Sequence, residues 1–214
     1  MNTIQYSLNL KTIILSVMGI VTSLSLVIGM KYYQSQARVV LATPIILDNP
    51  TPTKILELET SLSQISSDGT KKLIMKTTSN EGGVNKYALS VSDGSGANEQ
   101  IVFEKTLDIK KNITIPFNTW SPDNKYFFIQ EHEGEKNIVL AFKASGEPFN
   151  TEEKYLNVTD LFEKYDNKNN LNEATGWASQ NLIIFNTTTQ DNIKGPSYWF
   201  EVPSKAIIPL SIQF

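Results

Sequence analysis

An uncharged apolar run near the amino terminus constrains this chain more than any other feature. Residues 12–30 read TIILSVMGIVTSLSLVIGM, which is 19 residues without a charge, a proline or an amide side chain. About 20 helical residues cross the roughly 30 Å hydrocarbon core of a bilayer, and a helix pairs its backbone groups internally. Lys11 precedes the run, and Lys31 and two tyrosines follow it, as is typical of membrane interfaces. The pattern predicts a transmembrane helix over residues 12–30, with the lipid bilayer as its partner.

Two other interpretations of this run are weaker. A cleaved signal peptide has an apolar core of about 7–15 residues with small residues soon after it. Here the core is longer, and the small-residue pairs Ser35/Ala37 and Val40/Ala42 lie well beyond Met30. A buried core helix would need a polar face, which the run lacks. Cleavage stays open as an alternative, and the anchor is the favoured prediction.

The flanks of the run predict its orientation only weakly. Lys11 and the free amino terminus stand against Lys31 and Arg38, so the positive-inside bias is nearly balanced. The short flank 1–11 and the long carboxyl-terminal remainder indicate a signal anchor. We therefore expect a single-pass protein of the cell membrane, with residues 1–11 in the cytoplasm and the carboxyl-terminal domain outside it.

Residues 31–54 predict a stalk between the membrane and a folded domain. Pro44, Pro50 and Pro52 alternate with threonines there, and proline disfavours both helix and a continuous sheet. The segment NPTPT at 49–53 therefore indicates an extended spacer. The folded domain is predicted to span residues 55–214.

The charge of this domain argues against binding nucleic acid. Residues 1–38 hold 3 of the chain's 19 basic residues and no acidic ones, which leaves 16 basic against 22 acidic residues in 39–214. A phosphate backbone is bound by clustered cations, so a net acidic domain is a poor candidate. The chain has no cysteine, which excludes disulfides and thiolate metal sites.

Short strands dominate the pattern of the predicted domain. Eight segments of 6 or 7 residues are rich in β-branched or aromatic residues and are bounded by turn-forming residues. They are KLIMKT (72–77), KYALSVS (86–92), QIVFEK (100–105), YFFIQE (126–131), NIVLAF (137–142), LIIFNT (182–187), SYWFEV (197–202) and AIIPLSI (206–212). One helix is predicted over 159–165, with Thr159 or Asp160 as its N-cap, ended by the polar segment 167–173.

Three segments of the domain repeat one another. The clearest is WSPDNKYFF at 120–128, and ISSDGTKKLI at 65–74 and WASQNLIIF at 177–185 align with it. In WSPDNK the proline presets a turn dihedral, Asp123 can bond the local backbone, and Asn124 tolerates the left-handed conformation that Gly69 adopts freely. The repeat therefore predicts a hairpin turn before an apolar strand. Its spacing of about 54 to 57 residues is near that of a propeller blade.

The repeat resembles the TolB-like and dipeptidyl-peptidase-type β-propellers, whose blades carry a W-S-P-D-G-K motif followed by an apolar strand. The resemblance covers roughly residues 60–212, and the third copy has lost the Pro, Asp and Gly positions. It implies an all-β fold of antiparallel sheets, as an incomplete or small propeller of about three blades. In that family the motif shapes turns, which implies structural roles for Trp120, Pro122, Asp123, Asp68 and Gly69.

Three blades do not close a ring, because propellers typically have 4 to 8. Either terminal segments complete a fourth blade, or the array stays open, or copies of the chain associate as a homo-oligomer. An open array would leave edges that must be covered. A β-sandwich is the rival architecture.

Motifs that would identify a reaction are absent from the sequence, which has no G-x-S-x-G, Walker motif or G-x-G-x-x-G. The single histidine, His132, lies in a polar segment and is predicted to be a surface residue. The segment DNKNNLNE at 166–173 has a calcium-loop composition, but Lys168 occupies a ligand position, so a solvated loop is predicted. Trp177, Tyr198, Trp199 and Phe200 are predicted to pack the last sheet. The sequence thus gives no catalytic, cofactor-binding or metal residue.

These observations favour a non-enzymatic binding or scaffolding module held at the cell membrane, and they leave enzymatic activity undecided. The partner expected is another envelope protein or a cell-wall component. The alternative is an envelope hydrolase, such as a carbohydrate-active enzyme, that uses a pair of carboxylates. No cofactor is expected.

Overall fold

A computed structural model describes residues 58–80 and 82–210, all of which belong to the second of the chain's two units, Val40–Phe214. The predicted flank 1–11, membrane helix 12–30 and stalk 31–54 lie outside the described residues. Within the described residues, no helix combines the length and apolar character that spanning a bilayer requires.

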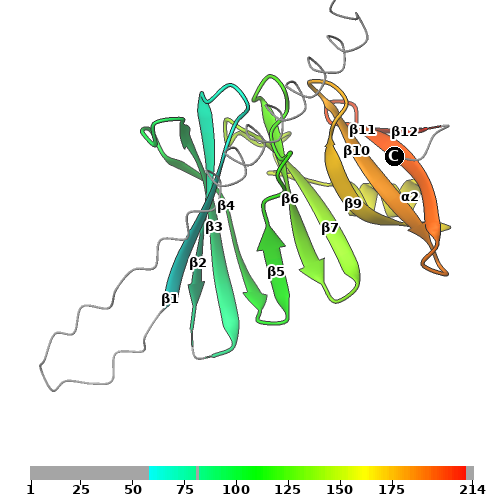
Figure 1. Cartoon of the computed structure of the whole chain (residues 1–214), viewed down its shortest axis with the longest axis horizontal. Helices are drawn as coiled ribbons and strands as arrows, with labels where there is room; N and C mark the ends of the chain where they lie inside the picture. Colours follow the sequence, from blue (N-terminus) through cyan, green and yellow to red (C-terminus); the bar gives the residue numbers. More distant parts are fainter. Residues whose placement is uncertain (1–57, 81, 211–214) are drawn as a thin grey trace, which may run out of the picture. The chain divides into compact units, whose positions relative to one another are not determined.

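The described chain is all-β, apart from one helix, and forms three four-stranded antiparallel sheets. Each sheet is a meander whose strands pair in chain order, and the sheets succeed one another along the chain (Figure 1). Sheet A contains β1 (Leu58–Ile65), β2 (Lys71–Ser79), β3 (Val84–Asp93) and β4 (Gln100–Asp108). Sheet B contains β5 (Lys111–Thr114), β6 (Tyr126–Glu133), β7 (Lys136–Lys143) and β8 (Leu156–Asn157). Sheet C contains β9 (Asn169–Trp177), β10 (Leu182–Thr189), β11 (Lys194–Glu201) and β12 (Ala206–Pro209).

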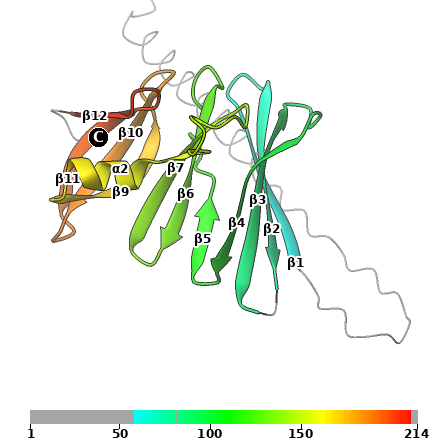
Figure 2. The ribbon, with the colours of Figure 1, turned by 180° about the vertical axis from the view of Figure 1, so that it is seen from behind.

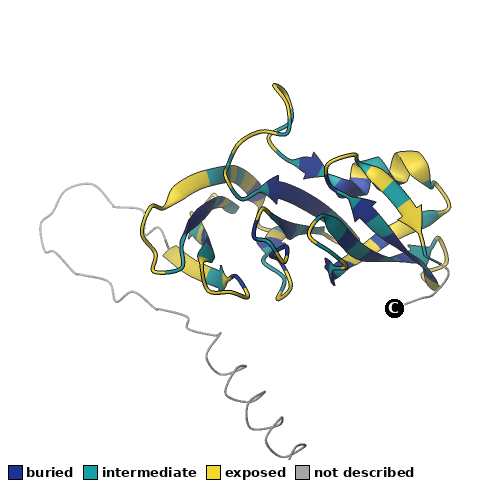
Figure 3. Ribbon diagram, turned by 90° about the horizontal axis from the view of Figure 1, so that it is seen from above, coloured by how far each residue is buried: buried dark blue, intermediate teal, exposed yellow. Residues whose placement is uncertain are grey.

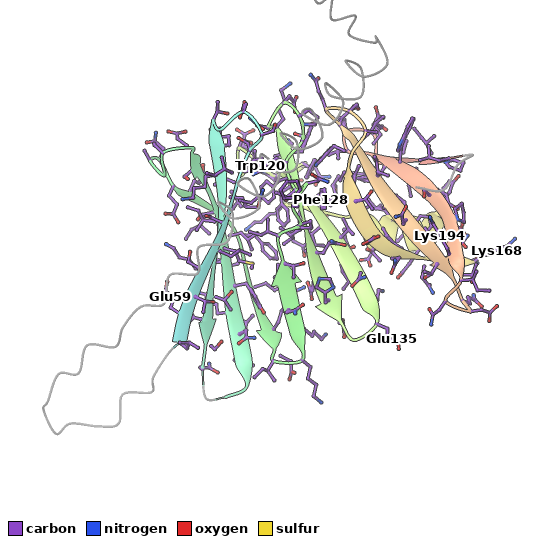
Figure 4. The ribbon with its side chains drawn as sticks, in the orientation of Figure 1. Glu59, Trp120, Phe128, Glu135, Lys168 and Lys194 are labelled. Atoms are coloured by element: carbon purple, nitrogen blue, oxygen red, sulfur yellow. The ribbon has the colours of Figure 1, made fainter. Side chains whose placement is uncertain are left out.

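Sheet B is buried on both faces. Along β6, Phe127 and Ile129 belong to a core cluster shared with sheet A, whereas Phe128 between them belongs to a cluster shared with sheet C. Because successive side chains of a strand point to opposite faces, a strand covered on both sides must be apolar almost throughout. This requirement explains the uninterrupted runs YFFI and IVLAF. Figure 3 shows the buried residues concentrated along the strands, and Figure 4 labels Phe128 within the stack.

The single helix, α2 (Val158–Tyr165), connects sheet B to sheet C (Figure 2). Its buried Phe162 packs edge-to-face on Phe185 and Tyr198, with ring centroids 5.0 and 4.9 Å apart. The N-cap is Asn157, whose side chain accepts a hydrogen bond from the Asp160 backbone N–H. The predicted helix is therefore correct in place, but its predicted N-caps, Thr159 and Asp160, lie two and three residues after the observed one.

Every strand predicted from the sequence lies within or overlaps an observed strand. The prediction that 166–173 is a solvated loop is wrong, because Asn169–Trp177 forms β9 and buries Leu171 and Ala174. The short strands β5 and β8 were also missed, and so was β1. Its register places Leu58, Leu62 and Gln64 on the face that looks toward sheet B, but the strand is largely exposed, so its apolar alternation is weak.

The turns between the first and second strands of the sheets share their backbone hydrogen bonds. The N–H of Ser66 donates to Lys71 O, that of Ser121 to Tyr126 O, and that of Ala178 to Leu182 O. A second set of bonds ties each turn to the end of the third strand, from Gly94 to Thr70, from Ala144 to Lys125 and from Val202 to Asn181. The sequence repeat is thus a repeat of structure, and these bonds establish which residues of the three sheets are equivalent.

The tryptophans of the repeat join consecutive sheets. The indole N–H of Trp120 donates to the carbonyl of Gln64 at 3.1 Å, and that of Trp177 donates to the carbonyl of Thr119 at 3.1 Å. Gln64 and Thr119 each precede the first serine of their turn by two residues, so the two contacts are equivalent. Each motif tryptophan therefore attaches its sheet to the preceding one, and Figure 4 labels Trp120.

Candidate functional site

The repeat turns of sheets A and B contact one another through a buried amide. Asn124 Nδ2 donates to Asp68 Oδ2 at 2.7 Å and to the Thr70 hydroxyl at 3.1 Å. Both Asn124 and Gly69 adopt positive φ, of 57° and 75°, as the sequence predicted for these equivalent turn positions. Sequence reasoning gave these residues turn roles, but it could not show that the two turns meet.

Asp68 is held ionised by this contact. The backbone N–H of Thr70 lowers the pKa of Asp68 well below its usual value of 3.8, and hydrogen bonds from Ser66 and Asn124 lower it further. At Asp123 burial acts to raise the pKa, but donors from Lys125 and Ser121 outweigh it, so that pKa is also lowered. Both turn carboxylates are therefore acceptors at neutral pH and hold the two turns closed.

A cavity of about 400 Å³ opens beside these turns. It is lined by Lys71 of β2, by Asn124, Lys125 and Tyr126 at the start of β6, and by Lys143, Ala144 and Ser145 at the end of β7. The volume lies within the range of about 300–1,000 Å³ that is common for small-ligand sites. The lining contains three lysines and no carboxylate.

The three lysines differ in how they are held. Lys71 lies 3.5 Å from Asp93, and Lys125 lies 3.1 Å from Asp123, so carboxylates just outside the cavity orient both ammonium groups. Lys143 donates to the Pro148 carbonyl at 2.9 Å and lies 5.3 Å from the centre of the Phe149 ring. Within 58–80 and 82–210, no carboxylate forms an ion pair with Lys143.

The side chain of Asn124 has one polar atom without a partner. Asn124 is 91 % buried, and its Oδ1 has no hydrogen-bond partner among the described residues. The amide cannot simply be turned over, because Nδ2 already donates to the Asp68 carboxylate, which accepts only. A buried acceptor without a partner costs about 1–3 kcal/mol, so the contact between the two turns is made at some cost in stability.

Two further cavities are lined by residues of α2. One, of about 520 Å³, includes the ion pair between Lys136 and Glu163, whose atoms lie 2.7 Å apart. The other, of about 420 Å³, includes Glu153, whose pKa is lowered by its hydrogen bond with Lys205. The first cavity is also lined by Glu135, and the second by Glu152 and Asp160, and none of these three forms an ion pair with a lysine within residues 58–80 and 82–210.

His132 is half-buried and bonded on both ring nitrogens, so the prediction of a surface residue needs correction. Its Nε2 lies 2.9 Å from the Thr114 hydroxyl, and its Nδ1 lies 2.6 Å from Asn137 Oδ1. Asn137 in turn donates to the Asn172 carbonyl at 2.5 Å. His132 thus connects strands β5, β6 and β7, and through Asn137 it reaches sheet C, which is a structural position.

The segment 166–173 has a capping role in place of the calcium-loop composition considered above. Asp166 accepts from the Tyr198 hydroxyl at 2.8 Å and from Asn169 at 2.8 Å. Burial, together with the bond to Asp166, raises the pKa of Tyr198 to about 12. Across the part of the chain that the structure describes, no three His, Asp or Glu side chains gather as metal ligands.

The aromatic group near the carboxyl end is divided between the two faces of sheet C. Tyr198 and Phe200 are buried against sheet B and α2, as predicted. Trp199 lies between them in sequence and therefore points to the outer face, where it is half-buried. Its indole N–H is buried and has no partner among the described residues.

Comparison with known proteins does not assign this chain to a family. Neither the protein-family models nor the curated proteins gave a match. Function must therefore be argued from the geometry of the cavity beside the turns.

Proposed function

We propose that this protein is a binding module, anchored in the cell membrane through residues 12–30, whose β-sheet domain lies outside the cytoplasm. The anchor rests on the apolar run and its flanks. The domain's role rests on one observation, the cavity between the turns of sheets A and B. A cavity lined by three lysines and by no carboxylate is suited to holding an anionic ligand.

The same cavity is poorly suited to hydrolysis. A glycoside hydrolase needs two carboxylates about 5–10 Å apart across its substrate, and one of them must stay protonated at neutral pH. No carboxylate lines this cavity. The nearby Asp68 and Asp123 have lowered pKa values, which is the direction opposite to that of a general acid. We therefore place the envelope hydrolase second.

The resemblance to TolB-like propellers bears on the architecture of the domain. Three consecutive four-stranded meanders with equivalent turns are what an incomplete propeller of three blades would contain. Propellers carry many unrelated functions, so the resemblance favours a fold and not a ligand. We propose the propeller-like description on this basis, in preference to a sandwich of two sheets.

The proposal is tested by measuring binding of the protein to cell-wall material and hydrolysis of that material side by side. The full chain, in a detergent with a polyoxyethylene headgroup, is mixed with cell-wall material of the source organism and sedimented. We expect the wild-type protein to sediment with the wall, and we expect a variant with Lys71, Lys125 and Lys143 replaced by glutamine to stay in the supernatant. Soluble reducing ends are measured in parallel, and we expect no increase with time.

A matched control uses lysines whose ion pairs lie elsewhere. Replacing Lys86, Lys111 and Lys136 with glutamine removes the same charge but leaves the cavity intact. This variant should sediment like the wild type. Time-dependent release of reducing ends by the wild type would overturn the proposal in favour of the hydrolase.

A further inference from the structure

We infer that the free edge of β1 is an interface between two copies of this chain, which pair through it as antiparallel strands about a two-fold axis. The described strands of sheet A pair in the order β1-β2-β3-β4, so β1 has a neighbouring strand on one side only. A free strand edge offers a row of unpaired backbone N–H and C=O groups, which favours pairing with another strand. The interface is separate from the cavity beside the turns and does not depend on its ligand.

The other edge strands of the described sheets carry features that hinder such pairing. Strands β5 and β12 have 4 residues each and β8 has 2, and β12 also contains Pro209. The pairings of β4 and β9 with their neighbours are interrupted by register shifts, and β4 carries Glu104 and Lys105. Short strands, proline, bulges and charged residues are the devices by which proteins protect the edges of their sheets.

Strand β1 lacks these features apart from one charged residue, Glu59. Its 8 residues, LETSLSQI, contain no proline or lysine, and they pair with β2 without a register shift. Leu58, Leu62 and Ile65 of this strand are exposed. A long, regular and partly apolar edge is the kind that pairs with a further strand. Among the described sheets, β1 is therefore the unprotected edge.

The register of sheet A indicates which backbone groups of β1 point to the free edge. The Ser66 N–H donates to Lys71 O at the turn into β2, and the positions that bond to a given neighbour alternate along an antiparallel strand. The even-numbered residues of β1 therefore bond to β2, and the odd-numbered residues direct their N–H and C=O groups away from it. The odd-numbered residues are Glu59, Ser61, Ser63 and Ile65.

One two-fold register uses all of these free groups. When Leu62 lies opposite Leu62 of the second copy, Ser61 pairs with Ser63 of that copy and Glu59 pairs with Ile65. Moving the axis by one residue leaves a free position of each copy without a partner. In the favoured register the two Leu62 residues form a non-hydrogen-bonded pair, in which the Cα atoms lie about 4.5 Å apart and the side chains are closest.

Charge complementarity favours a second copy over an unrelated strand. Within residues 58–80 and 82–210, neither Glu59 nor Lys72 forms an ion pair. Lys72 is the register partner of Ile65, so Glu59 of one copy and Lys72 of the other lie on one face, on either side of Ile65, with Cα atoms about 10 Å apart. The two Glu59 residues are about 20 Å apart, where their repulsion is largely screened. The chain that precedes Leu58 joins outside the paired residues 59–65.

Disulfide cross-linking of the full chain in detergent tests the register, because the chain has no cysteine of its own. Leu62→Cys places two thiols at directly opposed positions, within the Cα separation of about 4.4–6.8 Å that a disulfide requires. Thr60→Cys is the matched control on the same strand face, since its two copies would lie about 14 Å apart. On mild oxidation, we expect Leu62→Cys to form covalent dimer at least about tenfold faster than Thr60→Cys. Ile101→Cys, at an exposed position of β4, measures random collisions.

Light scattering over a range of protein concentrations tests the association itself. The Ser61 N–H points away from β2, so Ser61→Pro removes no hydrogen bond within sheet A. It removes a bond from each of the two Ser61–Ser63 pairs between copies, and should weaken dimerisation at least about tenfold. Ser61→Ala should dimerise like the wild type. If circular dichroism shows that Ser61→Pro does not fold, Ser63→Lys tests the same edge by placing a lysine on it.

Two results would overturn the inference. Equal rates of cross-linking for Leu62→Cys and Thr60→Cys would show that the strands do not pair in this register. A wild-type mass of one chain at every concentration, without cross-linking of Leu62→Cys, would leave the edge of β1 to another segment of the same chain or to a different protein. Neither result would bear on retention by cell-wall material, so the proposed binding function is tested separately.

Discussion

The two end sheets of the stack present different outer faces. In sheets B and C, four equivalent positions that face the preceding sheet are apolar, and in sheet A they are largely polar. The residues are Phe127, Ile129, Leu140 and Phe142 in sheet B, Ile183, Phe185, Tyr198 and Phe200 in sheet C, and Lys72, Ile74, Ser90 and Ser92 in sheet A. At the position of the motif tryptophan, which attaches sheets B and C to the sheet before them, sheet A has the exposed Ile65.

A polar network covers the outer face of sheet A. Ser90 donates to Glu99 at 2.6 Å, and Glu99 lies 3.3 Å from Lys76. The hydroxyl of Ser90 lowers the pKa of Glu99, which keeps that carboxylate ionised. Terminal repeats of stacked proteins need a polar outer face to remain in water. Sheet A therefore carries a polar outer face, although Ser90 and Ser92 on that face are buried.

Sheet C differs, because its outer face is apolar at the centre. Ile184, Trp199 and Ile208 pair across three neighbouring strands and share this face. Ile208 is 39 % exposed, and the indole N–H of Trp199 has no partner among the described residues. The three sheets therefore share turns and strand order, but the polarity of their outer faces differs.

The largest expected effect comes from exchanging equivalent residues between sheets. Phe127→Lys places at a buried position of sheet B the residue that sheet A has there, and it should cost more than about 4 kcal/mol through lost packing and a buried charge. Lys72→Phe should change the free energy of unfolding by less than about 0.5 kcal/mol. Thermal unfolding followed by circular dichroism measures both. Equal damage from both substitutions would show that the outer face of sheet A is packed against something.

A second comparison is between the stability costs of replacing Trp177 and Trp199. Trp177→Phe removes a donor from the Thr119 carbonyl and should cost about 1–3 kcal/mol. Trp199→Phe removes an indole N–H that has no partner, so it should cost at least about 1 kcal/mol less. Chemical denaturation of the two variants gives the difference. A larger loss for Trp199→Phe would mean that its N–H is bonded in the native protein.

A third comparison concerns ion pairs within and at the edge of the stack. Lys105 of sheet A lies 2.6 Å from Glu131 of sheet B, whose side chain is only 2 % exposed. Lys105→Met should cost about 1–3 kcal/mol, because a buried carboxylate loses its partner although water reaches the site. Lys86→Met breaks a pair on the outer face and should cost less than about 0.5 kcal/mol. Similar losses of unfolding free energy for Lys105→Met and Lys86→Met would contradict the distinction between the buried and exposed faces of sheet A.

The smallest effect is a change in acid sensitivity. The folded protein lowers the pKa of Asp68 below 3.8, so as the pH falls below that value the unfolded state binds a proton that the folded state does not. Stability from Asp68 is therefore present at neutral pH and is lost as the pH falls below about 4. Asp68→Asn should flatten the fall of melting temperature with acid, compared with Asp191→Asn in the exposed turn after β10. An unchanged slope would contradict this role of Asp68.

The sequence was sufficient to predict eight of the described strands and the repeat turns, because period-two patterns and turn residues are local. It failed at β9, since Asn and Glu occupy the exposed alternate positions and leave only Leu171 and Ala174 as apolar signals. It also missed the cavity, because Lys71, Lys125 and Lys143 are ordinary surface residues until two turns bring them together. The equivalence of Lys72 with Phe127, in contrast, follows from the aligned repeat of residues 65–74 and 120–128, and the hydrogen bonds of the turns confirm it.

Light scattering of the full chain after size-exclusion chromatography, with the detergent contribution subtracted, tests the account most directly. If sheet A ends the array, head-to-tail closure of two copies through its outer face is unfavourable, so Ile74→Glu on that face should leave the measured protein mass unchanged. A dimer that Ile74→Glu on this outer face converts to single chains would contradict the account, since it would show that this outer face is where a second copy binds.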